Sequence, residues 1–343
     1  DRSPSRGLGD VYKRQGEEVK RFSNMHGGRS LNYTLQVKAG TPYEIELDFE
    51  YFRSDAQLNF DIGFKQKVDI NASVARVKDA DIVVFASGVS PVLEGEEMGV
   101  NLPGFKGGDR TDIELPAIQR ELISALHRAG KKIILVNCSG SPIALEPETK
   151  NCEAILQAWY PGQQGGTAVA EVLFGDYNPG GRLPVTFYRN MSQLPDFEDY
   201  NMTGRTYRYM TQQPLFPFGY GLSYTTFDYG KLSLDKEQIK QGEPLKLAVS
   251  VTNSGQRDGE EVVQVYLKKQ DDAEGPGKTL RAFKRVYIPA GKSVDVEFDL
   301  KDKELEWWDA QSNTMRVCAG KYDIMVGRSS QDQDLQRGSF VIE

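Results

Sequence analysis

Three carboxylates crowd a short glycine-containing segment in the first third of the chain. Glu94, Glu96 and Glu97 lie within four residues of one another, and Asp109-Arg110 follows after Gly107-Gly108. Cleavage of a glycosidic bond uses one carboxyl group as a general acid and a second as nucleophile or base. Crowded like charges and partial burial raise a carboxyl pKa toward the range in which a proton can be donated. The pattern indicates acid/base chemistry, although acidic loops are more often solvated surface.

The elements that must position this segment are strands and helices in alternation. Continuous apolar runs of strand length occur at 81–86, 132–136 and 154–159, and helical patterns occur at 70–77, 116–129 and 165–174. This alternation predicts an α/β sandwich domain with a mostly parallel sheet and helices on both faces. Ligands of such sheets bind beyond the carboxyl ends of the strands, where the acidic segment lies.

Period-two alternation predicts β structure on both flanks. Residues 30–64 alternate around an Ala39-Gly40 turn, and the few strands they allow indicate a short β remnant. From Leu232 onward, alternating runs at 245–251, 263–267, 294–300 and 322–326 predict an all-β sandwich. The intervening residues 176–229 are rich in Pro, Gly and aromatic residues and predict a long ordered excursion with little regular structure.

These patterns divide the chain into four segments: 1–15, 16–68, 69–229 and 230–343. The hexapeptide at 10–15 back-translates into a mosaic-end adaptor used in transposase-based sequencing libraries, and residues 1–15 lack apolar periodicity. We therefore expect residues 1–15 to be an adaptor-derived scar with no part in the fold, and the natural chain to continue upstream.

Composition excludes several classes of function. The net charge of −7 gives no reason to expect nucleic-acid binding. The apolar runs are too short to span a bilayer. Cys138, Cys152 and Cys318 show no paired spacing, so neither a metal site nor a disulfide framework is predicted.

Two other features could carry chemistry of a different kind. Cys138-Ser139-Gly140-Ser141 follows a predicted strand, as a nucleophile would, but lacks the G-x-S-x-G pattern and an evident histidine partner. Trp159 and Tyr160 could stack on a sugar, although aromatic residues at strand ends are more often core. The alternatives to a glycosidase are thus a Cys- or Ser-dependent hydrolase and a non-catalytic carbohydrate-binding or scaffolding protein.

Residues 79–229 resemble the C-terminal α/β domain of glycoside hydrolase family 3. The matching segments are long and correctly spaced, and they lie at 93–98, 108–110, 159–163, 175–187 and 216–224. Residues 232–343 resemble the fibronectin type III-like domain that follows in many members. Residues 30–64 resemble the end of a protective-antigen-type β module inserted in some bacterial members. The segments 93–98 and 204–209 resemble the β-xylosidase branch more than the β-glucosidase branch.

The resemblance implies the C-terminal fragment of a retaining exo-β-glycosidase. The family's acid/base is a glutamate, commonly in a Gly-Glu-Gly context before Gly-Asp-Arg. The context here is Gly95-Glu96-Glu97, so Glu96 is the leading acid/base, with Glu94 and Glu97 as alternatives. The family nucleophile is an aspartate of an N-terminal (β/α)8 barrel, which nothing in this chain matches. The resemblance therefore implies that this chain is inactive without the barrel.

Four further residues are predicted to bind substrate or support its binding. Asp109 and Arg110 are expected to form an ion pair that fixes the loop, or to contact the sugar directly. Arg205 and Tyr207 are expected either to shape the rim of the site or to pack the excursion onto the sheet. The resemblance implies no metal and no cofactor, xylo- or gluco-oligosaccharides and the chain's own barrel as partners, and a periplasmic or extracellular location.

Overall fold

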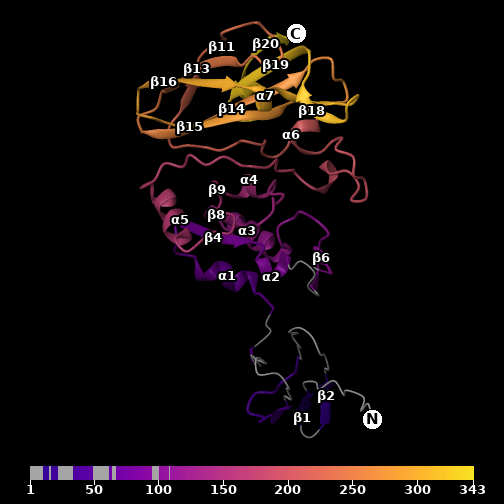
Figure 1. Cartoon of the computed structure of the whole chain (residues 1–343). Helices are drawn as coiled ribbons and strands as arrows, with labels where there is room; N and C mark the ends of the chain where they lie inside the picture. The colour runs from indigo at the N-terminus through magenta and orange to yellow at the C-terminus, as the bar shows by residue number, and fades with distance from the viewer. Residues whose placement is uncertain are drawn as a thin grey trace, which may run out of the picture. The chain divides into compact units, whose positions relative to one another are not determined.

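The computed structural model describes residues 11–14, 17–21, 34–48, 62–63, 67–94, 100–107 and 109–343. The chain divides into two compact units, Asp1–Val68 and Asp69–Glu343. In the first unit, strands β1 (Val11–Arg14), β2 (Glu17–Arg21) and β3 (Ile45–Asp48) pair antiparallel in the order β2-β1-β3. Figure 1 labels β1 and β2.

Strand β1 lies inside residues 1–15, which were expected to take no part in the fold. Ladder hydrogen bonds join backbone groups, so a strand can form without the apolar periodicity whose absence led to that expectation. The adaptor origin of residues 1–15 stays a prediction. The predicted turn at Ala39-Gly40 is formed, because Gly40 has φ 75° and Thr41 N donates to Lys38 O at 3.2 Å.

The first strand predicted between residues 30 and 64 is not formed where the structure describes it. Residues 34–38, the described part of the first predicted strand, form no strand, and Val37 is 53% exposed. Residues 31–33 and 58–61 lie outside the described residues.

The second unit opens with a parallel sheet, which confirms the predicted α/β class. Strands β4, β8 and β9 pair in that order, all parallel. Short strands β5, β6 and β7 form an antiparallel meander between β4 and the next helix. The elements are α1 (Ile70–Arg76), β4 (Ile82–Gly88), α2 (Pro91–Glu94), β5 (Asn101–Leu102), β6 (Phe105–Lys106), β7 (Asp109–Arg110), α3 (Ala117–Arg128), β8 (Lys132–Cys138), α4 (Glu148–Asn151), β9 (Ala154–Gln157) and α5 (Gly165–Phe174).

Helix ends follow the signals in the sequence. Asp69 caps α1 by accepting a hydrogen bond from Ala72 N at 3.0 Å. Helix α3 begins directly after Pro116, and Gly130 follows its end with φ 75°. Gly175 ends α5 in the left-handed conformation. In the described ranges, no helix combines the length and the apolar character needed to cross a membrane.

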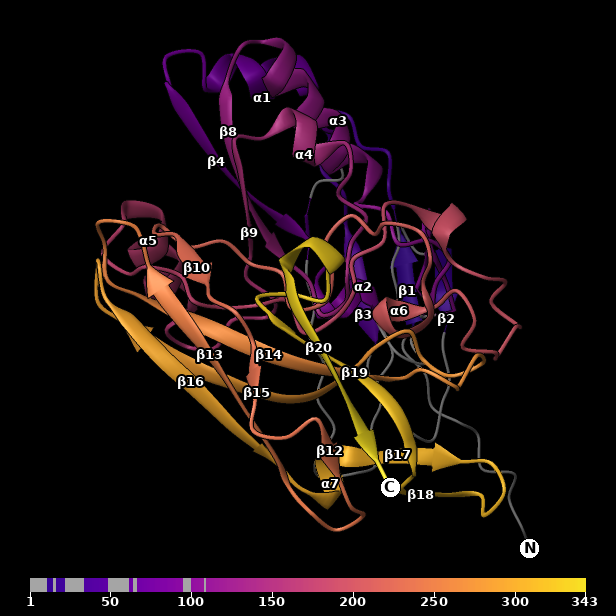
Figure 2. The same cartoon turned by 90° about the horizontal axis from the view of Figure 1, so that it is seen from above.

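The core of this α/β layer lies between α3 and the sheet. Ile123 and Leu126 of α3 pack with Ile133 and Leu135 of β8, all of them buried (Figure 2 shows these elements from above). The alternate residues of β4, Ile82 and Val84, point to the other face and are 53% exposed. Because β4 is an end strand of the sheet, fewer neighbours cover it than cover β8.

Residues 176–226 contain little regular structure, as predicted for 176–229, although Phe227–Tyr229 form strand β10. A 3₁₀ turn (Met191–Gln193) and α6 (Thr206–Tyr209) interrupt a chain that passes between the α/β layer and the sandwich (Figure 1). Hydrogen bonds to backbone oxygens attach this excursion to the sandwich. Gln264 Nε2 donates to Gly219 O at 3.1 Å, and Ser330 N donates to Phe218 O at 2.9 Å.

The remaining residues form the predicted fibronectin-like sandwich. One sheet has the order β10-β13-β11, with β16 also pairing to β13, and the other has the order β12-β20-β19-β14-β15. The elements are β10 (Phe227–Tyr229), β11 (Ser233–Leu234), β12 (Gln238–Ile239), β13 (Leu245–Asn253), β14 (Gly259–Lys269), β15 (Thr279–Ile288), β16 (Ser293–Leu300), α7 (Asp302–Leu305), β17 (Glu306–Asp309), β18 (Thr314–Val317), β19 (Gly320–Gly327), a 3₁₀ turn (Asp332–Asp334) and β20 (Leu335–Ile342).

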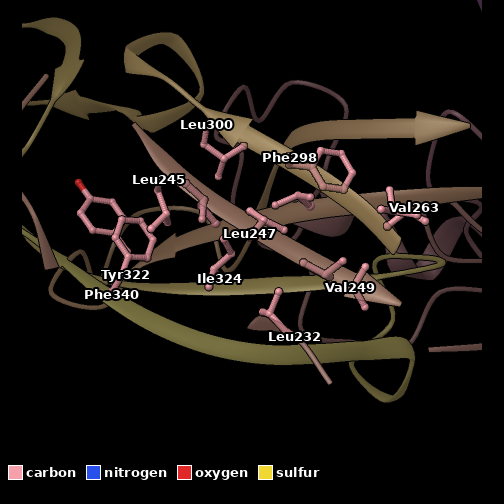
Figure 3. Close-up of a cluster of buried hydrophobic side chains, with 14 of the residues drawn as sticks. Leu232, Leu245, Leu247, Val249, Val263, Phe298, Leu300, Tyr322, Ile324 and Phe340 are labelled. Atoms are coloured by element: carbon pink, nitrogen blue, oxygen red, sulfur yellow. The ribbon is translucent and has the colours of Figure 1, made fainter. Parts of the chain in front are cut away.

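Alternating side chains of the two sheets meet in one core. Leu245, Leu247 and Val249 of β13 lie among side chains of the opposite sheet, and Tyr322 stacks on Phe340 with ring centroids 5.4 Å apart (Figure 3). The sequence did not predict β15 or β20. Most of β15 is only partly buried, and Gly338 interrupts the apolar pattern of β20.

A buried ion pair joins the excursion to the sandwich. Arg182 Nη2 lies 2.9 Å from Glu261 Oε2, and the two side chains are 7% and 1% exposed. Tyr229 donates a further hydrogen bond to Glu261 Oε1 at 3.2 Å. Burial raises the pKa of the Glu261 carboxyl, and the Arg182 charge opposes that shift.

Removing one partner of this pair should destabilise the chain. Glu261→Gln leaves the Arg182 guanidinium buried without a counter-charge, so the free energy of unfolding is expected to fall by about 3–5 kcal/mol. Urea denaturation followed by tryptophan fluorescence measures the change. As a control, Arg316→Met breaks the Arg316–Asp309 pair, whose arginine is 59% exposed, and should change stability far less. Similar small losses in both variants would contradict the expectation.

Candidate active site

The carboxyl ends of the three parallel strands meet at one edge of the sheet. Gly88 at the end of β4 is opposite Cys138 of β8, and Asn137 is opposite Gln157 of β9. A Cβ on Gly88 would lie 1.7 Å from Cys138 O, and the residue has φ 127°, so only glycine fits this approach. The segments that follow the strands therefore start side by side.

Glu94, at the end of α2, is held by residues that follow the other two strands. Ser141 Oγ donates to Glu94 Oε1, and the Tyr160 hydroxyl donates to Glu94 Oε2, both at 2.6 Å. The same hydroxyl lies 2.7 Å from Val89 O, which is therefore a second acceptor for its single proton. We call Glu94, Ser141 and Tyr160 the carboxylate clamp.

The clamp is tightly packed around Gly140. A Cβ at this position would lie 2.6 Å from the Tyr160 ring and 2.8 Å from Glu94 Oε2. Ser139 fixes the same turn by donating to Ser141 O at 2.8 Å, and Asn137 donates to Ser139 Oγ at 3.2 Å. The turn after β8 thus aims Ser141 at the carboxylate.

The Tyr160 hydroxyl keeps its proton, and so remains a hydrogen-bond donor in the clamp, over a wide range of pH. Burial, followed by the hydrogen bond to Glu94, raises the pKa of its hydroxyl to about 12. The phenol consequently keeps its proton throughout the neutral and mildly alkaline range.

Arg110 supplies positive charge beside the clamp. Its Nη1 donates to Ser141 Oγ at 3.2 Å, its Nη2 donates to Glu114 O at 3.0 Å, and its guanidinium lies 5.9 Å from the Phe105 ring centroid. Burial lowers the pKa of Arg110, whereas nearby acidic groups, including Glu94, oppose the shift. Arginine stays charged at any physiological pH. Arg110 therefore connects to Glu94 through Ser141.

The predicted ion pair between Asp109 and Arg110 is not formed. Asp109 is exposed on β7, opposite Lys106, and its neighbour's guanidinium points to Ser141 and Glu114 instead. Successive residues of a strand point to opposite faces, which separates the two side chains. A direct sugar contact by Asp109 stays a prediction.

Glu96 and Glu97 lie outside the described residues. Glu94, two positions before Glu96 in the sequence, is held in the clamp.

Arg205 and Tyr207 make their contacts away from the clamp. Arg205 donates to the backbone oxygens of Asp196, Asp199 and Asn201, which organises its own loop. Tyr207 stacks on Phe218 at 4.3 Å and accepts a hydrogen bond from Leu280 N at 3.1 Å. Tyr207 thus packs the excursion onto the sandwich, whereas the predicted packing role placed the excursion on the parallel sheet. A role of either residue in substrate binding stays a prediction.

The sequence did not predict the roles of Ser141 and Tyr160 in holding Glu94. Ser141 was weighed only as part of a nucleophile motif, and Tyr160 only as a stacking or core residue. Their one available signal was position, since each follows a parallel strand just as the acidic segment does.

The fold and the site define an α/β domain with a clamped carboxylate at the carboxyl edge of its sheet, joined to a β-sandwich. Residues 10–224 match the family model described as the glycosyl hydrolase family 3 C-terminal domain, and residues 261–330 match the fibronectin type III-like domain. The chain belongs to glycosyl hydrolase family 3, which confirms the predicted resemblance.

Individual relatives agree with this assignment. A xylan 1,4-beta-xylosidase of Xylanibacter ruminicola is 52% identical over 304 residues, covering 88% of this chain and 35% of the relative. A periplasmic beta-glucosidase of Salmonella typhimurium is 36% identical over 286 residues, covering 79% of this chain and 35% of the relative. A solved β-glucosidase of Erythrobacter marinus superposes with a TM-score of 0.69 at 38% identity, covering 80% of this chain and 36% of that one. The chain spans about a third of these relatives' length.

Removing the Tyr160 hydroxyl should loosen the segment that leads to the acidic loop. In Tyr160→Phe, Glu94 loses a charge-assisted hydrogen bond, and backbone amides in 89–94 are expected to exchange about tenfold faster. Hydrogen–deuterium exchange with mass spectrometry measures the rate. Tyr287→Phe is the matched control, because it removes a tyrosine–carboxylate bond to Asp258 in the sandwich. Unchanged exchange in Tyr160→Phe would show that the clamp does not hold α2.

The raised pKa of Tyr160 has its own optical signature. Because the folded pKa is about 12, Tyr160 should stay protonated, and the clamp intact, as pH rises through 10. The tyrosinate difference spectrum between the unsubstituted chain and Tyr160→Phe is expected to stay flat to about pH 11, where a tyrosine of ordinary pKa is mostly ionised. A tyrosinate signal near pH 10 would contradict this.

Proposed function

We propose that this chain supplies the general acid/base of a retaining exo-β-glycosidase, with Glu96 as the proton donor. The observation that carries the proposal is the carboxylate clamp, which anchors the acidic segment at the ligand-binding edge of a parallel sheet through Glu94. Membership in glycosyl hydrolase family 3 supports carboxylate chemistry at this edge.

Glu94 is better suited to anchoring than to proton transfer. Both of its oxygens accept short hydrogen bonds from residues that are themselves fixed by β8 and β9. A proton donor must instead reach the leaving oxygen of a substrate. Glu96 is two positions further along the chain, and Glu97 is the alternative to it.

The proposed reaction has two steps. A nucleophilic carboxylate, proposed to lie in the part of the longer enzyme that this chain does not span, attacks the anomeric carbon and breaks its bond to the leaving oxygen. Glu96 gives its proton to that oxygen. In the second step Glu96 takes a proton from water, and the resulting attack releases the sugar with retained configuration. This chain alone is expected to be inactive.

The proposed substrates are terminal β-linked xylosides, with β-glucosides as the second choice. The greater similarity to a xylosidase than to a periplasmic beta-glucosidase supports this order. The name of the latter relative also supports a periplasmic or extracellular location. Asp109 is proposed to contact substrate at the rim, and Arg110 is proposed to support the loop through Ser141.

Substitutions in the full-length enzyme test the assignment. Glu96→Gln should lower kcat/KM on aryl xylosides with poor leaving groups by about 10²–10⁴-fold, because such groups need protonation. Substrates with good leaving groups should be affected far less in the first step. Azide should rescue the variant by forming a β-glycosyl azide, since azide needs no general base. Initial rates and product analysis measure both effects.

Parallel variants separate the three glutamates. Glu97→Gln should keep the unsubstituted enzyme's dependence on leaving group, whereas Glu94→Gln should lower activity on all leaving groups without azide rescue. If Glu97→Gln alone shows rescue, the acid/base is Glu97. If the full-length protein hydrolyses no xyloside or glucoside, the catalytic proposal is wrong and a non-catalytic carbohydrate-binding role takes its place.

A further inference from the structure

A polar cleft, separate from the carboxylate clamp, lies between the excursion and the sandwich. Its volume is about 960 Å³, and its walls come from residues 201–217, from the loop after β14, and from β19 and the residues around β20. Sites for small molecules commonly have volumes of 300–1,000 Å³. The cleft is thus large enough for several sugar rings, and none of the clamp residues lines it.

Arg208 brings an unpaired positive charge to this cleft. Its Nε is buried and has no hydrogen-bond partner, and its guanidinium lies 5.5 Å from the Tyr209 ring centroid. Among the described residues no carboxylate forms an ion pair with Arg208. Its main chain is fixed, because Gly277 N donates to Arg208 O at 2.7 Å.

A second guanidinium, that of Arg281 on β15, is close enough to Arg208 to act on it electrostatically. Its Nε is also buried without a partner, and the group lies 5.3 Å from the Trp307 ring centroid. Burial lowers the pKa of Arg281 and the positive charge of Arg208 lowers it further, whereas nearby acidic groups, including Glu306, oppose the shift. Two neighbouring cations, neither of which forms an ion pair among the described residues, favour the arrival of an anion.

The carboxylates that line the cleft do not supply that counter-ion. Asp332 pairs with Lys278 and Arg337, and Asp272 accepts a hydrogen bond from Trp307 Nε1 at 2.6 Å. Asp323 accepts from Gln270 Nε2 at 2.7 Å. Glu274 also lines the cleft, but in the described part of the chain it forms neither a hydrogen bond nor an ion pair with Arg208.

Uncharged hydrogen-bonding groups make up much of the remaining wall. The side-chain amides suited to sugar hydroxyls are those of Asn201, Gln212, Gln213, Gln270 and Gln331. Tyr207 and Tyr209 add aromatic surface. A ligand that matches this lining carries many hydroxyl groups and one carboxylate.

We propose that this cleft binds an acidic oligosaccharide, with the carboxylate of a uronic acid on Arg208 and the sugar hydroxyls on the amide-lined wall. A bidentate arginine–carboxylate contact is the favoured geometry for such recognition. The choice of a xylose backbone for the ligand rests on the proposed function. The requirement for a carboxylate on the ligand rests on the charges found in the cleft. Bound there, an acidic branch of a polysaccharide holds the enzyme on a chain whose end enters the catalytic site.

Isothermal titration calorimetry on this 343-residue chain tests the proposal without any turnover. The probes are xylotetraose with one glucuronic acid branch, unbranched xylotetraose, glucuronic acid alone and inorganic phosphate. The branched sugar should bind at least about tenfold more tightly than unbranched xylotetraose, and its affinity should fall as salt rises. Glucuronic acid alone should bind weakly, because it lacks the hydroxyls of the backbone.

Charge-removing variants locate the site. Arg208→Gln should weaken binding of the branched sugar about tenfold and bring it to the level of unbranched xylotetraose. Arg128→Gln, on the exposed last turn of α3, is the matched control and should bind as the unsubstituted chain does. Circular dichroism checks folding, and Arg208→Lys, which keeps the charge, should recover part of the affinity.

Three results would overturn the inference. Equal binding of the branched and unbranched sugars would remove the role of the carboxylate. Phosphate binding as tight as that of the branched sugar would show a general anion site. Undiminished binding in folded Arg208→Gln would place the ligand elsewhere. None of these depends on whether Glu96 is the acid/base, because no bond is broken in the experiment.

Discussion

Parallel pairing of β4, β8 and β9 is the constraint from which the site follows. Its register brings Gly88 opposite Cys138 and Asn137 opposite Gln157, so the segments after all three strands begin at one edge. A shift by one residue would turn Ile133 and Leu135 out of the α3 interface, and burial of these side chains therefore fixes the register. The same register that fills the core brings Ser141 and Tyr160 to Glu94.

Much of this fold could be predicted because its signals are local. Pro116 and Gly130 bound α3, Gly175 ends α5, and period-two runs mark β13 and β16. The signals failed where tertiary contacts decide: β15 is an end strand with weak alternation, and residues 34–38 alternate but form no strand.

The site was less predictable, because its contacts join distant residues. Tyr160 and Glu94 are 66 residues apart, and no local pattern distinguishes a tyrosine that donates to a carboxylate from one that packs in a core. Arg110 belonged to a recognisable motif, yet strand geometry sends its side chain to Ser141 and not to Asp109. Motifs identified candidate residues, and topology determined which of the described ones meet.

Trp159 has φ 55°, a conformation that costs a non-glycine residue about 1–3 kcal/mol and persists only when surrounding contacts enforce it. Its ring meets Phe187 edge-on at 6.1 Å, Phe187 N bonds to Phe216 O, and the excursion that carries both phenylalanines is fastened by Gln264 of the sandwich. Contacts that begin in the β-sandwich thus help to hold Trp159, the residue before Tyr160, in this conformation. Engineering of the sandwich for heat tolerance therefore also alters the strain stored in the backbone next to the carboxylate clamp.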